Sequence, residues 1–111
     1  MRAKITNRER PAPGPGRVTS PTQLGALFRA ERKRRGLTLA EVYDATGLST
    51  RFLSEFERGK ENASLGRVLR ALESLGLEVL VFPRPESQRL LRMTRSDQNE
   101  KADTTAEARE P

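Results

Sequence analysis

Polar side chains with several hydrogen-bond donors and acceptors gather in one short stretch, GLSTRFLSEFERGK, over residues 47–60. The apolar residues of this stretch recur at helical spacing, so the polar residues between them predict one outward face. The members of that face are Ser49, Thr50, Arg51, Ser54 and Glu55. An arginine can donate two hydrogen bonds to a guanine edge, a threonine methyl can pack on a thymine methyl, and a serine can hold a phosphate. This set of side chains therefore favours contact with DNA.

The composition removes most catalytic chemistry. The chain contains no cysteine and no histidine, so it lacks thiolates, the commonest metal ligand and the usual general base. It also lacks a glycine-rich loop suited to phosphate, and its acidic residues show no paired spacing in an apolar setting. We expect no enzymatic activity, no metal and no cofactor. The absence of cysteine and of a long apolar run favours a cytoplasmic protein that is not associated with a membrane. The expected contact with DNA would associate it with the nucleoid.

The net charge of +6 is distributed unevenly along the 111 residues. Residues 1–20 hold five basic residues and one acidic residue, whereas residues 84–111 hold six of each. A basic balance of this kind favours an anionic partner, most often a nucleic acid.

The outward face needs supporting elements, and the sequence predicts four short helices. The first begins with Ser20 as N-cap and Pro21 at the first helical position, with Gln23 completing a capping box. The second is expected over residues 39–46, where Thr38 and Glu41 form another capping box. The third and fourth follow to residues 59 and 76, each opened by a serine N-cap and closed by a glycine.

The link between the second and third helices predicts a sharp turn. Gly47 can adopt a left-handed conformation at little cost, Leu48 then points inward, and Ser49 restarts the helix. This is the geometry of a helix-turn-helix, whose second helix can lie in a DNA major groove. The expected shared core consists of Leu24, Phe28, Val42, Leu48, Leu53, Phe56, Leu65, Leu69 and Leu72.

The stretch RAERKRRGLTLAEVYDATGLSTRFLSEFERGKENASLGRVLRALESLGL resembles the DNA-binding domain of the Cro/C-repressor (XRE) family. Its continuation through LEVLVFPR is similar to HipB-type antitoxins, in which a single strand follows that domain. The resemblance implies an all-α, lambda-repressor-like domain of four to five helices over residues 20–76. It also implies one C-terminal β-strand over residues 77–83 that pairs across a dimer.

The resemblance assigns site residues position by position. The base-reading positions match Ser49, Thr50, Arg51 and Glu55. Phosphate contacts are expected from Thr38, Leu39, Ser54, Lys60, Asn62 and Ser64. An ion pair between Arg32 and Glu57 would tie the first helix to the third. Two residues depart from the family: Leu39 replaces a glutamine, so it offers only its backbone N–H, and Tyr43 replaces a small alanine where the two motif helices cross.

A lone strand on a helical domain leaves backbone donors and acceptors without partners. The simplest solution is a two-fold dimer in which the strands pair antiparallel. The dimerisation residues would be Leu77, Val79, Leu80, Val81 and Phe82. Such a dimer places two recognition helices about one DNA turn (~34–36 Å) apart, so we expect an inverted-repeat operator.

The resemblance to HipB also implies a protein partner, a HipA-like Ser/Thr kinase toxin. Three function classes remain open: an autorepressing antitoxin that binds DNA and a kinase, a stand-alone XRE-type transcriptional regulator, and an interaction module without direct DNA readout. Residues 1–19 are expected to form a disordered basic arm rich in Pro and Gly. Residues 84–111 are expected to form a polar, largely disordered tail with at most a brief amphipathic turn over residues 86–93.

Overall fold

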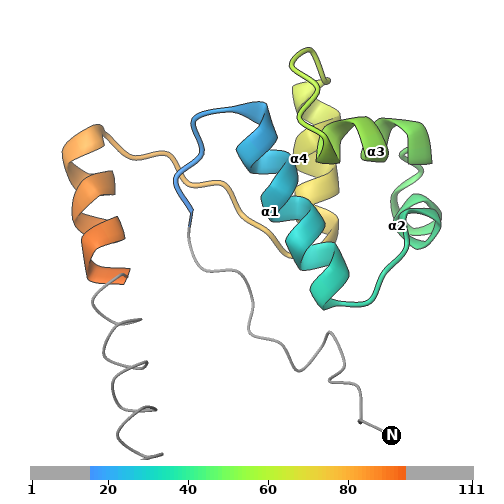
Figure 1. Ribbon diagram of the computed structural model, residues 1–111, viewed down its shortest axis with the longest axis horizontal. Coiled ribbons are helices and arrows are strands. Elements are labelled where there is room, and N and C mark those ends of the chain that lie inside the picture. Colours follow the sequence, from blue (N-terminus) through green and yellow to red (C-terminus); the bar gives the residue numbers. More distant parts are fainter. Residues whose placement is uncertain (1–15, 95–111) are drawn as a thin grey trace, which may run out of the picture. The chain divides into compact units, whose positions relative to one another are not determined.

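The computed structural model describes residues 16–94, so the predictions for residues 1–15 and 95–111 lie outside it. Four labelled helices follow one another along the chain: α1 Pro21–Arg34, α2 Leu39–Thr46, α3 Thr50–Glu57 and α4 Leu65–Ser74 (Figure 1). A further helical stretch covers residues 84–94, and no strand is present within residues 16–94. The fold is therefore all-α, as predicted. Residues 18–79 and residues 80–94 belong to separate compact units.

Helix caps explain where the four helices begin. Ser20, Thr38, Ser49 and Ser64 are the N-caps, and each hydroxyl accepts a hydrogen bond from a backbone N–H three residues later. The predicted capping box of α2 is complete, because Glu41 in turn accepts from the Thr38 N–H at 3.0 Å. The predicted box of α1 is only half formed. The Gln23 side chain reaches past the N-cap and accepts from the backbone and hydroxyl of Thr19.

α1 packs on α3, and α2 packs on both α3 and α4. In Figure 1, α2 is seen along its axis while α3 is seen from the side, so the two helices cross steeply. The core is centred on Phe28 and Phe56, whose ring centroids lie 5.1 Å apart. The buried apolar residues are Phe28, Val42, Leu48, Leu53, Phe56, Val68, Ala71, Leu72 and Leu75.

Two expected core residues of α4 are exposed. The relative exposure of Leu65 is 70% and that of Leu69 is 45%. The buried stripe consists of Val68, Ala71, the correctly predicted Leu72 and the C-cap residue Leu75, which follow the 3.6-residue period of one helix face. Leu65 and Leu69 occupy the neighbouring stripe, so in a single chain this apolar surface faces outward.

A buried carboxylate, not foreseen from the sequence, ties the end of α1 together. Glu31 is 3% exposed. Its two oxygens accept hydrogen bonds from Arg34 at 2.6 and 2.7 Å and from Arg35 at 2.9 Å. The hydrogen bond from Arg34 lowers the pKa of Glu31 most, and together with Arg35 it outweighs burial, so the pKa falls from 4.5 to about 2.

This carboxylate predicts a pH dependence of stability. Because the pKa is lower in the folded chain, ionised Glu31 stabilises the fold above pH 4.5, and this contribution is lost as the pH falls from 4.5 toward about 2. In that window the free energy of unfolding should decrease by up to ~1.4 kcal/mol per pH unit through this group. Urea unfolding at several pH values should show a steeper decrease for the wild-type chain than for Glu31→Gln. Parallel pH profiles would contradict the prediction.

The segment after α4 is irregular. The Leu77 N–H donates to the Leu72 carbonyl at 2.9 Å, and Leu77 packs against the core. Within the described residues, the backbone of residues 78–82 makes no backbone–backbone hydrogen bond. A strand needs a partner strand, so the expected pairing across a dimer stays a prediction.

Residues 84–94 are helical where only a brief turn is expected from the sequence. The Pro83 carbonyl accepts from the Ser87 N–H at 3.0 Å, which starts the helix. Pro85 then lies in the first turn, where its missing N–H costs no hydrogen bond. Within residues 16–94, no helix combines the length and the apolar character needed to cross a membrane.

Candidate nucleic-acid interface

The turn between α2 and α3 positions the predicted recognition helix. Gly47 has a φ of 76°, in the left-handed region, and its N–H donates to the Tyr43 carbonyl at 2.7 Å. The Thr46 hydroxyl donates to the Val42 carbonyl and accepts from the Leu48 N–H at 3.1 Å. Leu48 is 4% exposed and anchors the turn in the core. The chain can therefore turn sharply within three residues and present α3 at the surface.

The first turn of α3 is exposed. Ser49 uses its hydroxyl to cap the helix, accepting from the Phe52 N–H at 3.0 Å. Thr50 and Arg51 project outward, and the Arg51 side chain is 89% exposed. Leu53 and Phe56, on the opposite face, are buried. The structure thus brings the predicted base-reading side chains of the first turn onto one accessible face.

The carboxylate of Glu55, the fourth predicted base reader, forms ion pairs with two cationic side chains. One carboxylate oxygen accepts from the Arg51 Nε at 3.0 Å, and the other accepts from the Lys60 Nζ at 2.6 Å. The Lys60 ammonium and then the Arg51 guanidinium lower the pKa of Glu55. Glu55 therefore links a predicted base reader to a predicted phosphate contact.

The predicted phosphate contacts are found mainly at helix starts. Thr38 and Ser64 are the N-caps of α2 and α4, where free N–H groups and the helix dipole favour an anion. Leu39 packs its side chain against the core and lies at the first position of α2, so only its backbone N–H is suited to a phosphate. Asn62 is exposed in the loop before α4. The Ser54 hydroxyl accepts from the Arg58 side chain at 2.8 Å.

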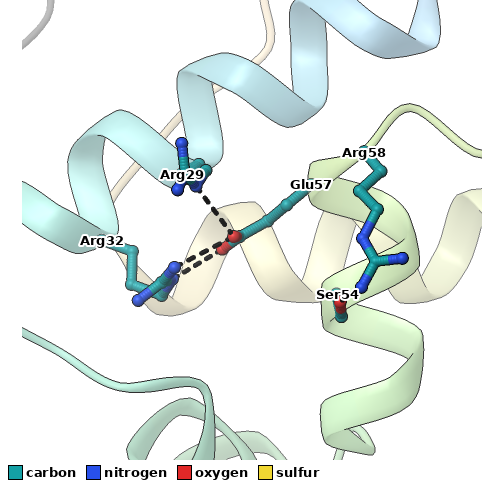
Figure 2. A pocket seen from close by; sticks show the side chains of 5 residues that line it. All are labelled: Arg29, Arg32, Ser54, Glu57 and Arg58. Carbon is teal, nitrogen blue, oxygen red and sulfur yellow. Dashed lines mark hydrogen bonds and ion pairs between the residues drawn. The ribbon is translucent and has the colours of Figure 1, made fainter.

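An ion pair joins Arg32 of α1 to Glu57 of α3, as Figure 2 shows. Two hydrogen bonds of 2.6 and 3.0 Å join the guanidinium to the carboxylate. The third nitrogen of Arg32 donates to the Leu37 carbonyl at 2.7 Å. Both side chains are nearly buried, with exposures of 11% and 6%. This pair therefore holds α3 against α1 and the loop that leads to α2.

Two arginines to which the sequence assigned no role lie beside this pair. Arg29 approaches Glu57 at 3.8 Å, and its side chain is 57% exposed. Together with Arg32, Ser54 and Glu57, Arg29 and Arg58 line a shallow pocket between α1 and α3 (Figure 2). Arg29 lies three residues before Arg32, and Arg58 lies four residues after Ser54. This helical spacing from predicted site residues was the sequence signal that could have identified the two arginines.

Tyr43 and the predicted dimerisation segment differ in how far they are exposed. Tyr43, at the crossing of α2 and α3, is 48% exposed, so its ring lies at the surface and does not wedge the helices apart. Of the predicted dimerisation residues, Leu77 packs on the core, while the others are exposed. Their relative exposures are Val79 52%, Leu80 70%, Val81 90% and Phe82 44%.

Known proteins share this sequence pattern. The family model for a helix-turn-helix domain matches residues 23–84. The chain is 36% identical over 63 residues to a Sinorhizobium fredii (strain NBRC 101917 / NGR234) protein named Uncharacterized HTH-type transcriptional regulator y4mF, covering 57% of this chain and 83% of that protein. It is 30% identical over 63 residues to Antitoxin HipB of Escherichia coli (strain K12), covering 57% of this chain and 72% of HipB.

Solved structures of HipB share the fold. A complex of a HipB variant with an O2 20mer matches with a TM-score of 0.60 at 28% identity, covering 63% of this chain and 97% of that chain. A HipA–HipB–O2–O3 complex matches with a TM-score of 0.58 at 28% identity, covering 61% and 96%. The chain therefore belongs to the helix-turn-helix family of transcriptional regulators and is of the HipB type.

Proposed function

We propose that this protein is a sequence-specific DNA-binding repressor that acts in the cytoplasm as the antitoxin of a HipA-like kinase. The observation that carries the proposal is the exposed face of α3, which presents Thr50 and Arg51 beyond a tight turn. An α-helix fits the major groove, where an arginine distinguishes guanine by a bidentate contact. The capped starts of α2 and α4 offer N–H groups for the flanking phosphates.

A two-fold dimer is part of the proposal. Leu65 and Leu69 expose apolar surface on α4, and the segment after α4 exposes Val79, Leu80 and Val81. Exposed apolar groups of this kind favour association. The unpaired backbone of residues 78–82 offers a strand edge to a second chain. Pairing of two such segments would supply the missing hydrogen bonds and present two copies of α3 to DNA.

The kinase partner is supported by the relatives. One matching structure is a HipA–HipB–O2–O3 complex, and one matching protein is Antitoxin HipB. A second function, a stand-alone transcriptional regulator, is favoured by the 36% identity to the HTH-type transcriptional regulator of Sinorhizobium fredii. Co-purification from the native host distinguishes the antitoxin from the stand-alone regulator. The antitoxin proposal expects a kinase to remain bound to the chain, whereas its absence in every preparation would favour the stand-alone regulator.

Selection from a pool of random-sequence duplexes tests the DNA proposal and requires no assumption about the operator sequence. We expect enrichment of an inverted repeat whose half-sites are ~10 bp apart from centre to centre. Enrichment of a single half-site would contradict the dimer, and failure to enrich any sequence would contradict sequence-specific binding.

A further inference from the structure

We propose that Glu55 sets DNA specificity by holding Arg51 and Lys60, and that it does not read a base itself. The inference deepens the proposed function and rests on it. Both oxygens of Glu55 are already used, one by the Arg51 Nε and the other by the Lys60 Nζ. The N4 amino group of a cytosine, the base donor that acidic side chains accept from, would therefore have to share a carboxylate oxygen with one of these cations.

The position of Glu55 argues against a role in helix stability. It lies near the C-terminal end of α3, where the helix dipole disfavours a negative charge. Its pairing with Arg51 places the cation four residues before the anion, which is the less favourable order on a helix. A carboxylate at this position therefore needs another reason, and its two partners supply one.

The two partners are affected differently. The Lys60 ammonium donates to the Glu55 carboxylate at 2.6 Å, so any phosphate must compete with that carboxylate for this cation. The Lys60 backbone N–H donates to the Glu55 backbone carbonyl at 3.1 Å, which holds the lysine close to the end of α3. Arg51 gives only its Nε to Glu55, and within the described residues its two terminal nitrogens make no hydrogen bond. Those nitrogens remain available for the O6 and N7 acceptors of a guanine.

This arrangement weakens binding to DNA of any sequence but preserves recognition of the specific sequence. An exposed ion pair is weak enough for a phosphate to displace, so Glu55 reduces non-specific affinity without blocking it. At a correct site, Arg51 reaches the base edge with its guanidinium already oriented. Glu55 thus acts as a positioning residue that raises the ratio of specific to non-specific affinity.

The test uses Glu55→Gln in the full chain, with two duplexes of equal length: the one enriched by selection and one of random sequence. We expect the variant to bind the random duplex about three- to tenfold more tightly, and its log K to depend on log salt more steeply by ~0.9, because Lys60 gains a phosphate contact. The ratio of selected to random affinity should fall at least about threefold. Adding Lys60→Ala should abolish most of the gain on random DNA.

Glu73→Gln is the matched control, because Glu73 is exposed on α4 and its substitution raises the net charge equally. If Glu55→Gln binds random DNA no better than Glu73→Gln does, the inference is overturned. It is also overturned if Glu55→Gln loses affinity only for the selected duplex, which would make Glu55 a base reader. If the wild-type chain enriches no duplex, the proposed function fails, while the random-DNA comparison still decides whether Glu55 withholds Lys60.

Discussion

Replacement of Glu57 by alanine is expected to lower the free energy of unfolding by ~3–5 kcal/mol, because it leaves a nearly buried guanidinium without its carboxylate. Glu57 accepts two hydrogen bonds from Arg32 and also faces Arg29 (Figure 2). The Arg32 side chain is 11% exposed, so water can replace little of what is lost. Urea unfolding monitored by circular dichroism measures the change.

The control for this prediction lies two residues away on the same helix. Glu55→Ala also removes a carboxylate with two cationic partners, but that cluster is exposed, and exposed ion pairs contribute little to stability. We expect a much smaller loss for it. A double variant, Arg32→Ala with Glu57→Ala, should be less unstable than the sum of the two single changes, since the unpaired charge is gone. Equal losses for Glu55→Ala and Glu57→Ala would contradict a special role for the buried pair.

Gly25→Ala is expected to destabilise the fold by ~1–3 kcal/mol, although alanine is the better helix former. Gly25 is buried where α1 crosses α3, and a Cβ there would collide with the carbonyl oxygen of Phe56 and lie 2.9 Å from that of Glu57. Backbone atoms cannot move aside as a flexible side chain can, so the two helices would have to separate. Thermal or urea unfolding of the variant measures the effect.

Gly66→Ala is expected to have the opposite effect on stability. Gly66 lies in α4 with nothing within 4 Å of the position of a Cβ, so alanine there should stabilise the chain by ~0.4–1 kcal/mol. The same substitution at two helical glycines thus separates helix propensity from close packing. A stabilising effect at both positions would show that α1 and α3 are not in close contact at Gly25.

Local chemistry made the helix boundaries predictable from the sequence. The start of each helix depends on a Ser or Thr that caps it, and the turn before α3 depends on Gly47, so neighbouring residues determine both. The accessible face of α3 followed from its 3.6-residue period. The choice between adjacent stripes of α4 depends on what the helix packs against, which is why Leu65 and Leu69 were wrongly placed in the core.

Contacts between charged side chains were less accessible to sequence reasoning. Charged residues usually lie at the surface, so nothing local indicated that Glu31 is buried beneath Arg34 and Arg35. The bond from Lys60 to Glu55 forms because the chain turns back after α3. The proposed role of Glu55 depends on that turn, whereas its place on the outward face and its match to a base-reading position of the family suggested a base reader instead.

The central claim is that α3 reads bases directly. It is tested most directly by measuring the affinity of Arg51→Ala for the selected and random duplexes at matched salt. We expect a loss of ~1–3 kcal/mol on the selected duplex and a much smaller loss on the random one. Arg70→Ala, which removes one exposed positive charge from α4, should leave the ratio of the two affinities unchanged. If Arg51→Ala also leaves that ratio unchanged, α3 does not read DNA through Arg51 and the central claim is contradicted.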